Sequence, residues 1–137
     1  MLDKERIKEK LSDLKIYSKR LSSIVPSDSD SYKNADIILK SAIERNLQLV
    51  SDVELDILAL LYKGLELKLS GDDLSLIESL NGKLSKKSIN KIKERRTLRN
   101  LLIHAYANSS YEEESFKQAY NTADVTEFIK EVRQLLT

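Results

Sequence analysis

The chain has 137 residues, of which 41% are hydrophobic and 33% charged, and its formal net charge is +1. This is the length and balance of one globular domain, and the absence of cysteine excludes disulfides, thiolate metal sites and a thiol nucleophile. The longest uncharged apolar run, residues 57–62, is far too short to span a bilayer, and no apolar run follows the charged N-terminus. We therefore expect one soluble, cytoplasmic domain over residues 1–137 that contacts no membrane.

Three glycines and one proline are few breakers for a chain of this length, which favours long helices over turn-rich sheets. In chain order, apolar residues recur at steps of three and four from Ile7 to Ile24 and predict a first amphipathic helix over residues 3–24. Pro26 ends this helix. The Ser and Asp residues of 27–31 are favourable N-caps for the helix that follows.

A second helix is predicted over residues 31–62, because the helical period continues without a break from Leu39 to Leu60. After Gly64 an alternating Leu-Glu-Leu-Lys-Leu stretch has the pattern of a strand. A single strand has no pairing partner in this chain, so we expect a frayed helix end there.

The remaining periodicity and caps predict further helices. They are a short third helix over 72–80, a fourth that is capped by Ser85 or Ser88 and ends near Ala107, and a final helix over 116–136, continuous or in two pieces joined near 121–122. Helices joined by short loops bury their apolar faces only against one another. The predicted fold is therefore all-α, an up-and-down bundle of four to five helices.

The fourth predicted helix carries two different faces near its end. Within an arc of about 100° on an ideal helix, one core-facing stripe is formed by Leu98, Leu101, Leu102 and Ala105. The opposite side mixes charged, hydrogen-bonding and apolar groups, namely Arg99, Asn100, Ile103, His104 and Tyr106. Ile89 and Ile92 also fall on this second side, so the phase of the apolar stripe shifts around residues 95–97. Apolar residues beside Arg99 and His104 predict a partner surface, and the simplest partner is a second copy of the chain in a two-fold dimer.

His104 is the only histidine, which excludes a multi-histidine metal site, and we expect no metal and no cofactor. RNA cleavage requires removal of the 2′-hydroxyl proton, protonation of the leaving 5′-oxygen and a cation for the phosphorane charge. Histidine suits the proton transfers and the planar fork of Arg99 suits phosphate. One imidazole cannot easily serve as base and acid in the same step, so a symmetric dimer would supply the second. Asn100, four residues before His104, can orient the imidazole or contact phosphate.

Positive charge is concentrated in the segment before this motif. Residues 83–99 contain eight basic side chains and one acid, whereas acids outnumber bases six to three in residues 111–137. Such a run is usually a solvated helix face. In its functional interpretation the run binds RNA, with Lys93, Arg95 and Arg96 as the candidate contacts.

The segment Arg99-Asn-Leu-Leu-Ile-His104-Ala-Tyr106 resembles the Arg-x(4 to 6)-His motif of the HEPN superfamily, in the Arg-Asn-x-x-x-His-x-Tyr form of HepT-like toxins. Residues 42–50, with Asp56 and Ile57 downstream, are similar to the long second helix of that family, and the likeness spans about residues 3–136. The Lys- and Ser-rich segment 71–91 departs from the family pattern.

This resemblance implies a HEPN-like helical homodimer that acts as a metal-independent endoribonuclease, the toxin of a toxin–antitoxin system. Arg99 and His104 would be the catalytic pair at the dimer cleft, with Asn100 beside them. The resemblance also implies a minimal nucleotidyltransferase antitoxin that transfers AMP to the motif tyrosine, here Tyr106. An adenylyl group two residues from His104 would obstruct the cleft and repel RNA phosphate.

Two other functions fit the same residues. A non-catalytic HEPN-like module would bind a nucleotide or a protein, with Arg99 and His104 as phosphate or interface contacts. A nucleic-acid-binding protein without chemistry would use the basic run 83–99, but that run lacks aromatic stacking residues. A paired-carboxylate hydrolase built on residues 112–114 is set aside, because acids are expected at a helix start.

Overall fold

The computed structural model describes residues 1–68, 71–104 and 111–137 of the chain. Within these residues it contains seven helices and no β-strand: α1 (Lys4–Ile24), α2 (Ser29–Lys33), α3 (Ile37–Gly64), α4 (Asp73–Ser79), α5 (Lys86–His104), α6 (Glu112–Tyr120) and α7 (Ala123–Leu135). The predicted all-α class is confirmed, and the final helix is in two pieces. No helix in the described part of the chain is long and apolar enough to cross a membrane.

The predicted second helix is interrupted, which raises the helix number above the four to five expected. Asn34 closes α2 by donating from its side chain to the Asp30 carbonyl, and Asp36 opens α3 by accepting from the Leu39 amide at 2.8 Å. Short polar side chains compete with the helix for backbone groups, which is why the chain breaks here. The apolar period begins only at Leu39, after the break, so it gave no support to a helix that started at residue 31. Tyr32 holds α2 on the bundle, because its buried ring packs on Phe116 with 6.1 Å between the ring centroids.

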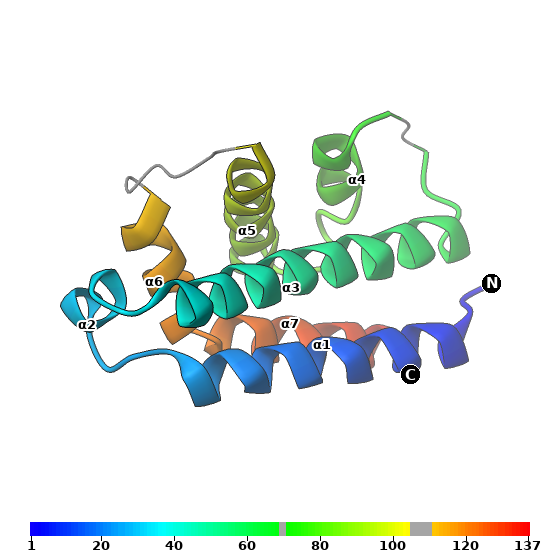
Figure 1. Cartoon of the computed structure of the whole chain (residues 1–137). Coiled ribbons are helices and arrows are strands. Elements are labelled where there is room, and N and C mark those ends of the chain that lie inside the picture. The colour runs from blue at the N-terminus through cyan, green and yellow to red at the C-terminus, as the bar shows by residue number, and fades with distance from the viewer. Residues whose placement is uncertain (69–70, 105–110) are drawn as a thin grey trace.

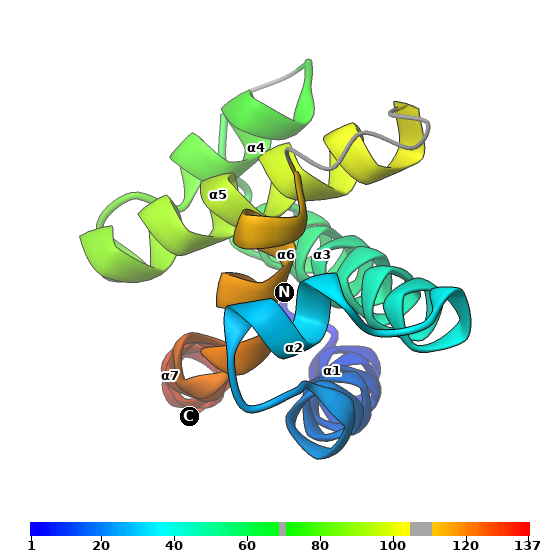
Figure 2. The same ribbon diagram turned by 60° about the vertical axis from the view of Figure 1, so that its left-hand side comes forward.

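The helices form two sets that run in different directions. Figure 1 shows α1 and α3 lying side by side in opposite directions, with α7 behind α1. Figure 2, turned by 60°, shows that α5 crosses α3 instead of running along it, with α4 and α6 on either side of α5. The arrangement therefore departs from a strictly up-and-down bundle, and the crossing leaves one end of α5 beyond the body of the molecule.

The predicted core stripe of α5 is only partly correct. Leu98 is buried, but Leu101 is 37% exposed and Leu102 is half-buried. The buried residues of α5 instead include Ile89 and Ile92, as the predicted shift of the apolar stripe requires. The last turn of α5 reaches past α4 and α6 (Figure 2), and Leu101 there is exposed while Leu102 still packs against the core.

Candidate functional site

A buried ion pair fixes α5 to α3 one turn before the candidate site. The Arg95 guanidinium donates from Nε to Glu54 Oε1 at 2.7 Å and from Nη2 to Glu54 Oε2 at 2.6 Å. Glu54 is fully buried and Arg95 is 7% exposed. Burial raises the pKa of the Glu54 carboxyl, while the charge and hydrogen bonds of Arg95 act in the opposite direction.

This burial corrects the prediction that Arg95 contacts RNA. Its donors are directed into the protein and its side chain is closed off from solvent, so it cannot reach a phosphate backbone. The basic run alone did not reveal this, because the partner Glu54 lies 41 residues away. One signal was present: Glu54 falls within the apolar stripe of α3, next to the buried Val53 and near Ile57, where an acid must have a partner.

Arg99, the next basic residue on the same side of α5, is held at the surface. Its Nε donates to Asp52 Oδ1 on α3 at 2.8 Å, and its Nη1 donates to Asn100 Oδ1 at 3.0 Å. The side chains of Arg99 and Asp52 remain 29% and 37% exposed. The guanidinium is therefore fixed in orientation yet accessible to a bound anion. Asp52 was not among the predicted site residues, because it lies 47 residues from Arg99 in the sequence.

The other motif residues lie at the end of α5. The hydrogen bond that the structure gives Asn100 runs to Arg99 and not to His104, so Asn100 orients the guanidinium. His104 is exposed and is the last residue of α5. Tyr106 and Ala105, which completed the predicted motif and stripe, lie outside the described residues.

Lys93 and Arg96, the two remaining candidate RNA contacts, are at the surface and face α4. Lys93 Nζ lies 3.4 Å from Glu78 Oε1, and Arg96 Nε lies 3.6 Å from Asp73 Oδ2. Both are partly exposed ion pairs of the kind that contribute little to stability. These cations are therefore available to an anion that displaces the carboxylates, in contrast to Arg95.

Some apolar side chains of α4 and of the last turns of α5 are exposed. Leu101 and Ile103, on either side of Leu102, are 37% and 39% exposed, and Leu74 on α4 is 39% exposed. Ile103 falls on the same side of α5 as Arg99 and His104, so this side combines charged, hydrogen-bonding and apolar groups, which is the composition expected of an interface. No group of three or more His, Asp or Glu side chains in the described part of the chain is arranged to hold a metal ion.

Comparison with known proteins gives a consistent picture. The model of the family described as ribonuclease HepT-like matches residues 7–132. No curated protein sequence matches the chain.

Among solved structures, the chain is similar to the tri-AMPylated Shewanella oneidensis HEPN toxin in complex with MNT antitoxin, with 20% identity and a TM-score of 0.83 over 98% of this chain and 99% of that one. A toxin–antitoxin structure with AMP-PNP has the same identity and TM-score over 93% and 97% of the two chains. YutE of Bacillus subtilis, a cytosolic protein of unknown function, is 18% identical with a TM-score of 0.80 over 98% and 91%. At these identities the likeness concerns the fold.

Proposed function

Since the chain belongs to the HepT-like ribonuclease family, we propose that it is the toxin of a toxin–antitoxin pair and a metal-independent endoribonuclease that acts as a homodimer. The observation that carries this proposal is the pair Arg99 and His104 on the exposed end of one helix, with the guanidinium fixed by Asp52 and Asn100. The family description, ribonuclease HepT-like, indicates the class of reaction. Arg99 can bind phosphate and His104 can transfer protons, which are the two tasks that RNA cleavage requires.

In the proposed reaction the 2′-oxygen of RNA attacks the adjacent phosphorus and the bond from phosphorus to the 5′-oxygen breaks. The 2′-hydroxyl proton passes to a neutral His104 imidazole, and a protonated imidazole gives a proton to the leaving 5′-oxygen. The products are a 2′,3′-cyclic phosphate and a 5′-hydroxyl. Arg99 stabilises the negative charge that develops on the phosphoryl oxygens.

Asp52 and Asn100 have a positioning role in this mechanism. An arginine side chain has several freely rotating bonds, and two hydrogen bonds at separate nitrogens hold its planar fork in one orientation. A guanidinium that is already oriented stabilises the transition state without reorganising. The Asp52 carboxylate also cancels part of the positive charge of Arg99. The arrangement favours catalysis only if a fixed orientation of the guanidinium contributes more than the charge that Asp52 cancels.

The second imidazole would come from a second copy of the chain. A two-fold axis near the end of α5 would bring two His104 side chains together and would cover Ile103, which lies on the same side of the helix and is otherwise exposed. Lys93 and Arg96 on the same helix would then extend the positive surface along the RNA backbone.

We also propose that a minimal nucleotidyltransferase antitoxin regulates this site by transferring AMP from a nucleoside triphosphate to the Tyr106 hydroxyl, with release of pyrophosphate. One similar solved structure is a tri-AMPylated HEPN toxin in complex with MNT antitoxin, which supports this idea. Tyr106 follows His104 by two residues, so an attached adenylate would place bulk and negative charge next to the imidazole.

The direct test is to measure cleavage of a labelled RNA by purified His104→Ala and Arg99→Ala proteins. Loss of general acid–base catalysis predicts a decrease of roughly 10²- to 10⁴-fold for His104→Ala. Loss of the phosphate contact predicts roughly 10²- to 10³-fold for Arg99→Ala.

Lys19→Ala, an exposed change on α1, is the matched control and should leave the rate unchanged. Circular dichroism and light scattering should give the same helicity and the same dimer mass for all four proteins. A His104→Ala protein that cleaves RNA at the wild-type rate would end the catalytic proposal and favour the non-catalytic binding module.

A further inference from the structure

A groove between α1 and α7 lies away from the candidate site. Two cavities of about 360 and 350 Å³ adjoin there, and because Arg133 and Thr137 line both, they form one continuous groove. The buried side chains of Leu11, Ile129 and Leu136 form its floor. Figure 2 shows α1 and α7 next to each other at the bottom of the molecule, with the free end of α5 on the other side of α3.

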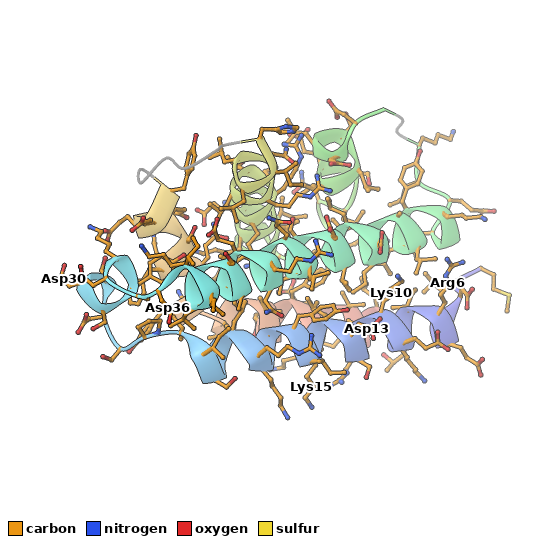
Figure 3. All side chains as sticks on the ribbon, viewed as in Figure 1. Arg6, Lys10, Asp13, Lys15, Asp30 and Asp36 are labelled. Atoms are coloured by element: carbon orange, nitrogen blue, oxygen red, sulfur yellow. The ribbon has the colours of Figure 1, made fainter. Side chains whose placement is uncertain are left out.

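The rim of this groove is positively charged. Lys8 and Lys15 line it from α1, and Lys130 and Arg133 line it from α7. No Asp or Glu side chain among the described residues lines either cavity, and none of the four cations forms an ion pair within the described chain. In Figure 3, Lys15 extends from α1 on the side away from α3, whereas Lys10 points toward α3, where it pairs with Asp56.

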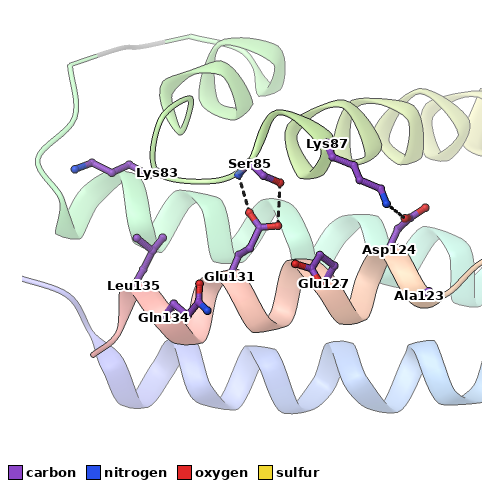
Figure 4. A pocket seen from close by; sticks show the side chains of 9 residues that line it. All are labelled: Lys83, Ser85, Lys87, Ala123, Asp124, Glu127, Glu131, Gln134 and Leu135. Carbon is purple, nitrogen blue, oxygen red and sulfur yellow. Dashed lines mark hydrogen bonds and ion pairs between the residues drawn. The ribbon is translucent and has the colours of Figure 1, made fainter.

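Charge is segregated on both helices that form the groove. On an ideal helix the α1 lysines at positions 4, 8, 15 and 19 fall within an arc of about 60°, and no acid of α1 falls within it. On α7 the acids Asp124, Glu127 and Glu131 lie on a different face and line another cavity, toward the start of α5 (Figure 4). The positive rim is therefore not neutralised by carboxylates of its own helices.

The shape and chemistry of the groove select one class of occupant. Two helices that lie side by side leave a groove that accepts a third helix, and an apolar floor flanked by cations complements a helix with an apolar stripe flanked by acids. None of the lining side chains is aromatic, which disfavours single-stranded nucleic acid because its bases need stacking partners. A concave groove also fits a flat bilayer surface poorly.

We propose that this groove, which we call the α1/α7 groove, docks an acidic amphipathic helix of a partner protein. Along α7 the lining runs from Thr126 to Gln134, which corresponds to roughly 12 Å, or about two turns of a docked helix. The partner segment therefore presents apolar residues at i, i+3 or i+4 and i+7, with Glu or Asp on both sides of that stripe. The proposal does not depend on ribonuclease activity, since the groove shares no residue with the candidate site.

The test uses the full chain and a fluorescent helical peptide with leucines at i, i+3, i+4 and i+7 and glutamates on both flanks. Fluorescence anisotropy should show saturable binding that weakens as salt increases. Binding should be at least tenfold weaker for the Lys15→Glu/Arg133→Glu protein and less strongly reduced for Lys15→Gln/Arg133→Gln. The matched control is Lys86→Glu/Lys117→Glu, which makes the same change in net charge at exposed positions on α5 and α6.

The remaining outcomes count against the proposal. Equal loss of binding in the groove variant and the control variant would mean that the peptide responds only to net charge. An oligouridine RNA or phosphatidylserine vesicles that bind through the same residues, while the peptide does not, would replace the proposal by a nucleic-acid or membrane surface. RNA cleavage by the groove variant should stay at the wild-type rate, so failure here is distinguishable from failure of the proposed function.

Discussion

Each half of α5 contains an arginine that pairs with a carboxylate of α3, but the two arginines lie in different environments. Just before the first half, Glu131 of α7 accepts hydrogen bonds from the backbone amide and the hydroxyl of Ser85 at 2.6 and 2.9 Å (Figure 4). Within the first half, Arg95 is enclosed with Glu54. In the second half, Arg99 makes a similar contact with Asp52, but at the surface, and exposed His104 follows.

This difference shows that the environment of a charge, more than its identity, decides what it can do. A buried arginine with a bidentate carboxylate is committed to holding two helices together. A surface arginine with one carboxylate and one amide partner remains accessible to phosphate. The first half of α5 thus anchors the helix, and the second half presents the candidate site.

The largest effect should come from removing the buried carboxylate in the anchoring half. Glu54→Ala leaves the Arg95 guanidinium buried and unpaired, which should lower the free energy of unfolding by roughly 3–5 kcal/mol. Urea denaturation followed by circular dichroism measures this loss. The double variant Glu54→Leu/Arg95→Met should recover most of the stability, because it removes both charges and keeps the volume. Exposed ion pairs contribute less than about 1 kcal/mol to the free energy of unfolding. If Glu54→Ala lowers it by no more than that, the two halves of α5 do not differ in the way described.

A smaller effect, and on activity instead of stability, is expected from the carboxylate in the second half. Asp52→Asn should lower the free energy of unfolding by no more than about 1 kcal/mol, because the pair with Arg99 is exposed. Catalysis should fall by about tenfold, equivalent to about 1.4 kcal/mol, through kcat with KM little changed, because Asp52 orients a group that acts in the transition state.

Asp52→Glu is the matched control, since it keeps a carboxylate that can reach Arg99, and it should restore part of kcat. If Asp52→Asn changes KM alone, or destabilises the fold as much as Glu54→Ala does, Asp52 is not a positioning residue.

The smallest effect concerns the start of α5 and depends on pH. Partial burial raises the pKa of Glu131, but hydrogen bonds from Ser85 and Ser88 outweigh this and lower it below its usual value of 4.5. A carboxyl whose pKa is lower in the folded state adds stability above pH 4.5, and that stability is lost as the pH falls through the folded-state value.

Glu131→Ala should therefore cost about 1 kcal/mol at pH 7, as loss of a helix cap usually does. The difference from wild type should shrink as the pH falls below 4.5. Thermal denaturation between pH 7 and pH 3 measures it, with Glu127→Ala on the same face of α7 as the control. A difference that is constant with pH would show that the Glu131 charge does not anchor α5.

Helix prediction succeeded where one face of a helix is buried along its whole length. Residues 3–24 were predicted for α1, which spans Lys4–Ile24, because the apolar period there coincides with packing against α3. The break between α2 and α3 was missed, since it depends on Asn34 and Asp36 side chains that compete for backbone groups, and it lies before Leu39, where the apolar period begins. Leu101 was assigned to the core from its position on the helix, but it is 37% exposed, because the helical period does not say where a neighbouring element ends.

The sequence by itself determined the helical class, the family resemblance and the placing of Arg99, Asn100 and His104 on one helix, because these follow from residues within a few turns of each other. Only the tertiary structure decided that Arg95 is enclosed while Arg99 is accessible, and that Asp52 and Glu54 are their partners. The physical reason is that burial and ion pairing depend on which distant segments the fold brings together. For these two arginines the partners are more than forty residues away on a helix that α5 crosses.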